Sequence, residues 1–441
     1  MDKISLAPME RRLRKRYLKL VEAHMHCATA VAAGPTAVLS TTTGFAQTQA
    51  MWRFLNNDRV GLDALIQPPR AAARQAVEEL GLRHVLLIHD WSKVAFGGHP
   101  SKQDTAKLTH DTDVGYELTT GLAVSPADGS PLAPMQMHLK TAKEVLSTSP
   151  VRPGRYSHHL QQVLPMMRAS ADWGLAAKLV HVIDREADSV GHMRRWDKAG
   201  HWFLVRADDR KVLWEEQPIL LSALVQKLRT RGGFVASRQV EYRGALVQQY
   251  VAETTVTLYR PAKKRVGKKR RQVRGRPLAL RLVVAQLRND HGRVVAQWML
   301  LTNLPPSEAD AGTIALWYYW RWRIESFFKL LKSGGQQLEH WQQETAPAIA
   351  RRLLVASMAC VVVWGLERRR DEKAQELKKL LVQLSGRQVK RTRPCTASAM
   401  LAGLFVLLPI LELIRTHGGD LRPVQELALS VLPFLKSAVD V

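Results

Sequence analysis

Two stretches of this 441-residue chain, His84-Val-Leu-Leu-Ile-His-Asp90 and Lys178-Leu-Val-His-Val-Ile-Asp184, follow one pattern. Each is a mostly apolar run that finishes in an aspartate and is followed by turn or helix signals. Such runs are typical of strands in an α/β sheet, which carries ligand-binding side chains at the edge where its strands end. Taken singly, either aspartate is more often a helix cap or a loop residue. Together they predict an α/β fold with two carboxylates near one sheet edge.

A third carboxylate lies in the segment YYWRWRIESFFKLLK, residues 318 to 332, which predicts an amphipathic helix. At 100° per residue, four polar side chains fall within about 60° of Tyr318, and large apolar side chains occupy the opposite side. Those four are Arg321, Glu325, Lys329 and Lys332. A solvated face with ion pairs three and four residues apart is the ordinary explanation. With two strand-end aspartates elsewhere in the chain, we expect this face to bind a ligand instead. The helix is expected to begin near Ser307 or Asp310, a capping box, and to stop at Gly334-Gly335.

Asp90, Asp184 and Glu325 would repel one another if they converged without a counter-charge. Mg²⁺ or Mn²⁺, held by a few carboxylates with water and phosphate oxygens in the remaining positions, removes that cost. No cysteine and histidine pattern competes for a metal, because Cys27, Cys360 and Cys395 are scattered. The sequence therefore predicts a site for hard divalent cations.

The motifs around these acids resemble those of a known family. The pattern Tyr318-x2-Arg321-x3-Glu325-x6-Lys332 matches the YREK signature, and Asp184-Arg-Glu-Ala-Asp188 matches the DREAD block, of the cut-and-paste DDE transposases of bacterial insertion sequences and composite transposons. More loosely, Met51 to Asp58 resembles the family's N-terminal segment, and Gln297 to Thr302 resembles the strand before its glutamate helix. Asp104, Asp111 and Asp113 also lie near the first acid; Asp90 is preferred because only it terminates a strand-like run.

The resemblance implies a ribonuclease-H-like fold in which Asp90, Asp184 and Glu325 form the DDE triad and hold two Mg²⁺ ions, with Mn²⁺ as a substitute. It further implies nicking at a transposon end, attack of the released 3′-OH on the opposite strand to form a hairpin, and strand transfer into target DNA. Tyr318, Arg321, Lys329 and Lys332 would position phosphates. The expected partners are double-stranded DNA, namely inverted-repeat ends and target, and a second copy of the chain in the DNA-bound complex.

Composition independently favours nucleic acid as the partner. The chain carries 65 Lys and Arg against 39 Asp and Glu, a formal charge of +26, as expected of a protein that binds phosphate backbones. A membrane surface would attract the same charge, but the apolar stretch 353–366 is too short to span a bilayer, and the stretch 400–414 contains Pro409. The opening residues lack the apolar segment of a signal peptide, and the cysteines suit a reducing compartment. We therefore expect a cytoplasmic protein without a membrane partner.

Three regions are expected along the chain. Residues 1–75 are predicted to be a helical DNA-end-binding region with a basic start, although such a start is often only a solvated helix face. Residues 76–345 are predicted to be the catalytic domain, with a hairpin turning at 127–130 and helices near 157–173 and 186–198. Asp184 and Glu325 are 141 residues apart, which predicts an insertion, mainly β, at about 200–296. Residues 346–441 look helical, and the resemblance implies that they form the dimer contact.

Further DNA contacts are expected from the insertion and from two tryptophans. The run from Arg260 to Arg276 has no apolar periodicity and is predicted to be a loop on phosphates, with a flexible solvated tract as the alternative. Its densest part is Lys268, Lys269, Arg270 and Arg271. By resemblance, Trp298 and Trp322 would flank a flipped base and Arg206 would contact a phosphate. Without the resemblance, the simpler interpretations are that Trp298 is an ordinary core residue and that Arg206 forms a surface ion pair.

Two other classes of protein remain open. A catalytically silent DNA-binding relative, either an inhibitor or a domesticated protein, shares the motifs but does not need three acids facing phosphates. A basic RNA-binding factor explains the charge but not the three acids. Short inverted repeats flanking the gene would favour a mobile element.

Overall fold

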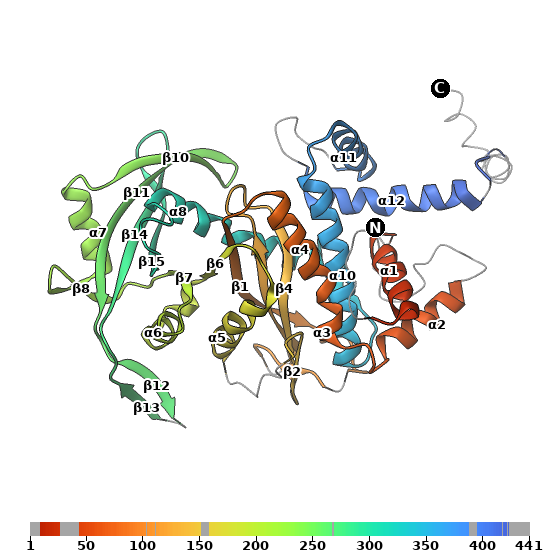
Figure 1. Ribbon diagram of the computed structural model, residues 1–441, viewed down its shortest axis with the longest axis horizontal. Helices are drawn as coiled ribbons and strands as arrows, with labels where there is room; N and C mark the ends of the chain where they lie inside the picture. The colour runs from red at the N-terminus through yellow and green to blue at the C-terminus, as the bar shows by residue number, and fades with distance from the viewer. Residues whose placement is uncertain are drawn as a thin grey trace.

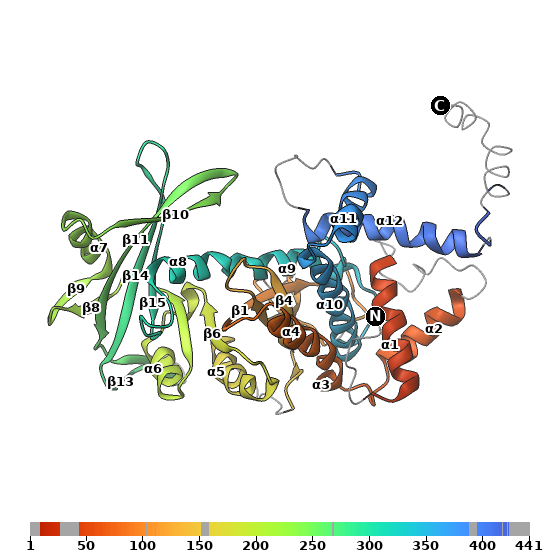
Figure 2. The ribbon, with the colours of Figure 1, turned by 45° about the horizontal axis from the view of Figure 1, so that its top comes forward.

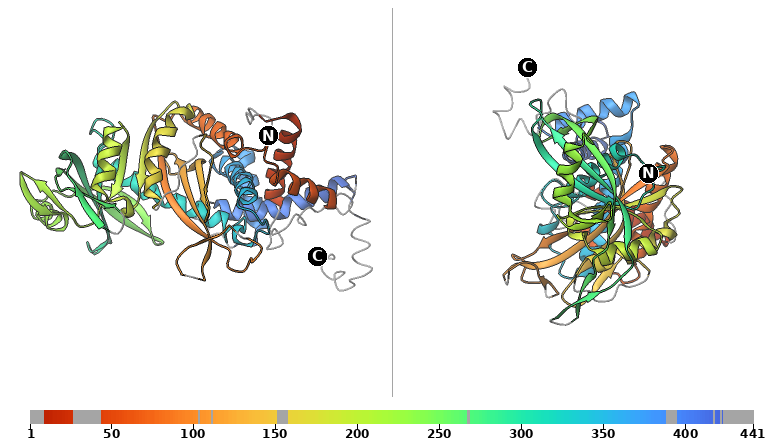
Figure 3. Two further views of the ribbon diagram at one scale, coloured as in Figure 1. Left: turned by 90° about the horizontal axis from the view of Figure 1, so that it is seen from below. Right: turned by 90° about the vertical axis from the view of Figure 1, so that its left-hand side faces the viewer.

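The computed structural model describes residues 9–26, 44–102, 104–110, 112–150, 158–266, 269–387, 395–416, 418–420 and 422. Over these residues the molecule is elongated, with helices from both ends of the sequence at one end and a β-rich region at the other (Figure 1 and Figure 3). The helices are α1 (Arg11–His26), α2 (Gly44–Leu55), α3 (Leu62–Leu65), α4 (Gln67–Glu79), α5 (Leu160–Ala169), α6 (Val190–Lys198), α7 (Leu221–Thr230), α8 (Ala311–Tyr319), α9 (Arg323–Leu331), α10 (Ala346–Arg368), α11 (Glu372–Leu384) and α12 (Ala397–Thr416).

One mixed sheet runs through the molecule, and 13 strands belong to it in the part of the chain that the structure describes. Its main path is β5-β4-β3-β1-β6-β7-β15-β14-β11-β8-β9, with β2 paired to β3 and β10 to β11. The strands are β1 (His84–Ala95), β2 (Ala106–Lys107), β3 (Val114–Val124), β4 (Pro131–Lys140), β5 (Val145–Ser147), β6 (Lys178–Ile183), β7 (Trp202–Arg206), β8 (Lys211–Trp214), β9 (Gln217–Leu220), β10 (Val235–Tyr242), β11 (Ala245–Leu258), β14 (Leu278–Arg288) and β15 (Val294–Thr302).

The centre of the sheet is parallel and its two sides are antiparallel. β6 lies between β1 and β7 and is parallel to both, whereas β3 and β4 on one side and β15, β14 and β11 on the other pair antiparallel. The β3–β4 hairpin turns where predicted: Gly129 has a φ of 68°, which glycine adopts readily, and Ser130 N donates to Asp128 Oδ1 at 3.0 Å. A mixed α/β fold is thus confirmed.

Apolar side chains on both faces of the sheet are covered by helices. Successive residues of a strand point to opposite faces, so Leu204 joins the core beneath α4, α8, α9 and α10, whereas Phe203 and Val205 join the core beneath α5, α6 and α7. The helix predicted near 157–173 corresponds to α5 followed by the 3₁₀ turn Ser170–Trp173. Residue 157, where the prediction began, lies outside the described residues. The one predicted at 186–198 is the 3₁₀ turn Arg185–Ala187 followed by α6.

Strand β1 continues beyond the point at which the sequence predicted its end. Its backbone pairing with β6 stops at His89 and Ile183, but its pairing with β3 continues from Asp90 to Ala95. Asp90 therefore lies in mid-strand, where a neighbour is present on one side only. Asp184 follows directly after β6 and caps the 3₁₀ turn Arg185–Ala187.

The β-rich insertion extends the same sheet. β7, which was predicted to lie within the insertion, pairs parallel to β6, and β15, β14 and β11 continue outward from it (Figure 2). Helix α7 packs on the outer strands and was not predicted. The connection from β15 to α8 is fixed by Arg281 of β14, which donates to the backbone oxygens of Leu304 and Ala309, both at 3.0 Å, and pairs with Glu253 at 2.6 Å.

The prediction of a loop for residues 260–276 was wrong. Strands β12 (Ala262–Val266) and β13 (Lys269–Val273) form a two-stranded hairpin that is separate from the main sheet and projects from the body (Figure 1). Cross-strand backbone hydrogen bonds stabilise a hairpin without an apolar face, so the missing periodicity did not exclude strands. Lys268 lies outside the described residues, and Lys269, Arg270 and Arg271 lie on β13.

The N-terminal and C-terminal helices that the structure describes pack together. Helix α1 contacts α10, α12 and α2. Arg351 of α10 donates to the backbone oxygens of Leu55 at 2.8 Å and Val60 at 2.9 Å and pairs with Asp58 at 3.0 Å. Helices α10 and α12 are long and apolar enough to cross a membrane; the apolar window of α10 is 83% buried, as in a core helix, and that of α12 is 28% buried. Length and composition alone are weak evidence for a membrane span.

Candidate active site

The segment predicted as one helix is broken by a 3₁₀ turn. Helix α8 begins after Asp310, whose side chain accepts from Thr313 N at 2.6 Å, so Asp310 is the cap and Ser307 lies outside the helix. Residues Trp320–Trp322 form the turn, and α9 follows without a change of general direction (Figure 2). A 3₁₀ turn has about 3.0 residues per turn, whereas an α-helix has 3.6. The angles of 100° per residue that were assumed from the sequence therefore apply within α8 and within α9, but not across the turn between them.

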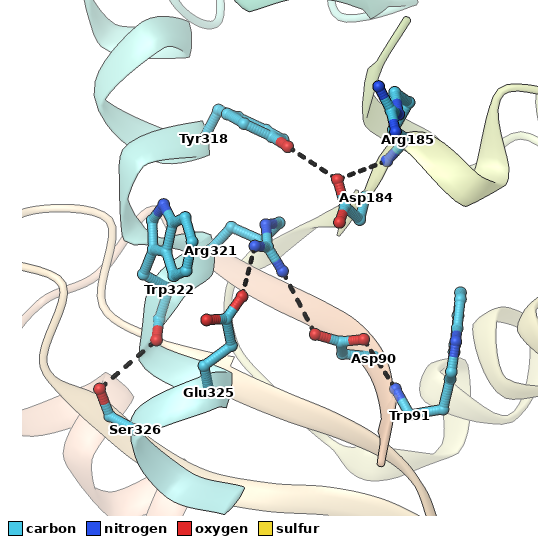
Figure 4. Close-up of polar contacts among 9 residues, drawn as sticks. All are labelled: Asp90, Trp91, Asp184, Arg185, Tyr318, Arg321, Trp322, Glu325 and Ser326. Carbon is cyan, nitrogen blue, oxygen red and sulfur yellow. Dashed lines mark hydrogen bonds and ion pairs between the residues drawn. The ribbon is translucent and has the colours of Figure 1, made fainter. Parts of the chain in front are cut away.

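Arg321 lies in this turn and joins two of the three predicted triad acids. Its guanidinium donates to Asp90 Oδ2 at 3.2 Å and to Glu325 Oε1 at 2.6 Å (Figure 4). The Arg321 side chain is only 6% exposed, whereas those of Asp90 and Glu325 are 17% and 41% exposed. Glu325 is therefore partly exposed, while Arg321 is buried between the acids, and ligand binding by this face stays a prediction.

The third acid, Asp184, lies on the other side of the same space. The Tyr318 hydroxyl of α8 donates to Asp184 Oδ1 at 3.2 Å, and Arg185 N donates to the same oxygen at 2.5 Å (Figure 4). Tyr318 is buried, and burial followed by the charge of Asp184 raises the pKa of its phenol. At neutral pH the phenol therefore keeps its proton and remains a donor.

The charges of the three acids interact. The pKa of Asp90 is raised to about 6, chiefly by burial; the Arg321 guanidinium and the Trp91 N–H oppose this rise, and the charges of Asp184 and Glu325 add to it. Burial alone would lower the pKa of Arg321, but Asp184, Tyr318, Asp90 and the hydrogen bond to Glu325 outweigh that effect, and its pKa is raised. Arg321 thus supplies the counter-charge for a cluster of acids drawn from three parts of the chain.

The acids suit a hard divalent cation in kind and charge. Carboxylate oxygens are the ligands of Mg²⁺ and Mn²⁺, and the charges of Asp184 and Glu325 act on Asp90 beside the single guanidinium of Arg321. Over the described residues, no group of three or more Asp, Glu, His and Cys is close enough to hold one ion as the side chains stand. Arg321 occupies the space between Asp90 and Glu325, so its side chain must shift for both acids to bind one cation.

A substitution at Asp90 tests this electrostatic balance without DNA. For an acid whose pKa is raised on folding, ionisation destabilises the folded state as pH rises from about 4 to about 6, and the full cost is present above pH 6. In metal-free buffer, Asp90→Asn should therefore match the wild type near pH 4 and gain up to about 3 kcal/mol at pH 7 to 8. Thermal unfolding from pH 4 to 8 measures this difference in stability. Asp290→Asn, in an exposed turn, is the control. A gain in Asp90→Asn that does not depend on pH, or an equal gain in Asp290→Asn, would refute the prediction.

The other predicted phosphate contacts are distributed unevenly. Lys329 is exposed on α9 and Trp322 is 50% exposed, as its wheel position predicted. Arg206 ends β7, and its charge acts on the Tyr318 phenol, so it lies beside the site. Lys332, in contrast, pairs with Glu339 at 3.2 Å and donates to the Lys93 backbone oxygen. Glu339, which no sequence pattern marks, also accepts from Ala95 N at 3.0 Å.

Trp298 lies in the core rather than on the surface. It is 8% exposed and packs between Tyr242 and Tyr318, with ring centroids 6.3 Å and 6.4 Å away. In this structure, Trp298 is therefore a core residue, which is the simpler of the two interpretations made from the sequence. Stacking on a base, which the resemblance implied, requires the surrounding rings to move, and that role stays a prediction.

The geometry also separates the candidates for the first acid. Asp104 accepts from the Tyr116 hydroxyl and from Ala346 N at 3.0 Å, at the start of α10. Asp111 lies outside the described residues. Of Asp90, Asp104 and Asp113, Asp90 is the one that pairs with Arg321, which in turn pairs with Glu325. We therefore keep Asp90 as the first acid.

Comparison with known proteins identifies the family. The family described as "Transposase DDE domain" matches residues 83–362, well over half of the chain, and this protein belongs to it. No curated protein sequence matches the chain significantly. A solved structure described as "piggyBac transposase synaptic complex with hairpin DNA" is similar over 92% of this chain and 75% of that one, with a TM-score of 0.36 and 7% identity. A likeness this weak carries no argument about the site.

Proposed function

We propose that this protein is a DNA transposase of the bacterial insertion-sequence type, with Asp90, Asp184 and Glu325 as its catalytic acids. The observation that carries the proposal is that, in a chain of the Transposase DDE domain family, one buried arginine pairs with Asp90 and Glu325 and also interacts with the charge of Asp184. The YREK and DREAD motifs supply the side chains of this arrangement. The ribonuclease-H-like core that the resemblance implied is part of the same proposal.

The acids would hold two Mg²⁺ or Mn²⁺ ions, which supply an activated water and stabilise the leaving oxygen of a DNA phosphate. Arg321 would turn from Asp90 and Glu325 to the phosphate, where its planar fork can donate two hydrogen bonds. Tyr318 holds Asp184 in place through its hydroxyl. Lys329 and Arg206, at the rim, would bind further phosphates.

The formal charge of +26 supports a DNA partner, because each phosphate contact releases condensed counter-ions and adds to affinity. Residues 1–75 would bind the transposon ends, and the C-terminal helices would join two copies on paired ends. Of those helices, α10 and α12 pack against α1 within one chain. A change in the way residues 1–75 bind DNA would therefore alter the position of the C-terminal helices.

A cleavage assay tests the proposed function directly. DNA carrying the inverted repeats that flank the gene is incubated with protein and Mg²⁺, and the products are separated on a denaturing gel. We expect a nick at the repeat end, followed by a hairpin of twice the single-strand length. Binding without any nick would instead indicate the catalytically silent relative, and a second cut without a hairpin would indicate another route for the second strand.

Trp298→Ala tests the proposed base extrusion. Nicking should be nearly normal, but hairpin formation should slow by about 5- to 150-fold, since a stacked base contributes about 1–3 kcal/mol. An abasic site at the extruded position should partly restore hairpin formation, because no base needs to be unstacked. Trp317→Ala is the matched control, because Trp317 is 4% exposed in the same core. If both variants lose nicking, hairpin formation and thermal stability together, Trp298 is only a core residue.

A further inference from the structure

A stacked pair of rings lies directly beside Asp90. The Trp91 ring packs on the His159 ring with centroids 3.6 Å apart and planes 22° from parallel. Trp91 is the residue after Asp90, and its backbone N–H donates to Asp90 Oδ1 at 2.8 Å (Figure 4). The position of the Asp90 carboxylate is therefore tied to the position of Trp91.

His159 is itself held by two carboxylates from different segments. Its Nε2 lies 3.0 Å from Glu186 Oε2 and its Nδ1 lies 3.4 Å from Glu117 Oε2. Glu117 is on β3, directly opposite Lys93 of β1. Glu186 is in the 3₁₀ turn that Asp184 caps. Only the doubly protonated ring can donate to both carboxylates at once.

These contacts bridge the place where the sheet no longer holds the two aspartates together. Backbone pairing between β1 and β6 ends at His89 and Ile183, one residue before Asp90 and one before Asp184. Beyond that point β1 stays with β3, while the chain after β6 turns away into Arg185–Ala187. Their separation is then set by side-chain packing, and His159 reaches both segments.

We infer that His159 is a positioning residue that fixes the distance between Asp90 and Asp184 and so prepares both acids to bind metal. Stacking on Trp91 secures the Asp90 side, and the contact of the ring nitrogen Nε2 with Glu186 secures the Asp184 side. Neither contact touches the reacting atoms. The inference rests on the proposed function, because it assumes that both aspartates are metal ligands.

Two substitutions separate the two contacts of His159. His159→Phe keeps an aromatic ring to stack on Trp91 but removes both nitrogen donors, and His159→Gln keeps a donor but removes the ring. Substitution of residues that orient metal ligands typically lowers metal affinity about 10- to 100-fold. We expect Mn²⁺ affinity, measured on the full-length protein by calorimetry, to fall about 10-fold in each variant. Nicking should recover towards the wild-type rate at high Mg²⁺, whereas DNA-end binding should be unchanged.

Asp90→Asn and His291→Phe are the controls. Asp90→Asn removes a proposed ligand and should lower Mn²⁺ affinity more than either His159 variant, whereas His291 is exposed in the β14–β15 turn and its variant should bind as the wild type does. Wild-type Mn²⁺ affinity in His159→Phe and His159→Gln, with affinity lost in Asp90→Asn, would overturn the positioning role alone. Wild-type affinity in Asp90→Asn as well would overturn the proposed metal site. Thermal unfolding of each variant confirms that it is folded.

Discussion

Asp90→Asn, Asp184→Asn and Glu325→Gln should each abolish cleavage of transposon-end DNA while leaving its binding largely intact. Each substitution removes one charged ligand from the proposed metal site but none of the basic side chains that bind phosphate. The loss of nicking should exceed about 100-fold, because changes to the residues around metal ligands already lower activity by about 10- to 100-fold. Nicking under single-turnover conditions and gel-shift titration measure the two properties separately.

Asp113→Asn is the matched control, since it removes a nearby carboxylate that was an alternative first acid. It should nick at close to the wild-type rate. If Asp90→Asn nicks normally and Asp113→Asn does not, the first acid has been assigned to the wrong residue. If all four variants nick normally, the cluster around Arg321 is structural.

Changing Lys268, Lys269, Arg270 and Arg271 together to Ala should weaken DNA binding across all sequences. Each phosphate contact contributes about 0.9 to the slope of log K against log salt, so the slope should fall by up to about 3.6. Between 50 and 200 mM salt, this corresponds to about a 100-fold difference in the salt sensitivity of binding. Three of these residues lie on β13, in the hairpin that projects from the sheet. Equilibrium titrations at several salt concentrations provide the slope.

The control removes the same charge elsewhere, by changing four exposed residues on and beside α11 to Ala: Arg370, Lys373, Lys379 and Arg387. Its slope should change less than that of the hairpin variant. Equal slopes for the two variants would mean that the hairpin adds only overall charge. An unchanged slope in the hairpin variant would mean that its side chains stay in solvent.

The regular parts of the fold follow from local patterns. The apolar runs before Asp90 and Asp184 are strands of one sheet, the Asp-Gly turn forms a hairpin, and helices follow residue 346. These features depend on periodicity and turn chemistry within short windows. The length of β1 was missed because residues 91–95 pair only with β3, a partner that periodicity does not reveal.

The sequence singles out the acids of the candidate site but does not reveal their contacts with one another and with Arg321. Spacing placed Glu325 with Arg321, but the ion pair from Arg321 to Asp90 spans 231 residues and depends on the tertiary fold. The 3₁₀ turn in Trp320–Trp322 buries Arg321, although a regular wheel left it exposed. Likewise Lys332 was expected to face phosphate, and only the structure shows it paired with Glu339, a residue on a later turn.

The continuous sheet and the hydrogen bonds of Arg281 to the backbone of residues 304 and 309 hold β11, the strand that precedes the basic hairpin, in a fixed position relative to the Glu325 helix. The sheet then sets the spacing between the basic hairpin, where it leaves β11, and the candidate site. A DNA end that engages both must bend or twist to fit that spacing, so easily deformed sequences near the cut should be favoured even where no side chain touches a base. Selectivity would then arise partly from the stiffness of the DNA itself.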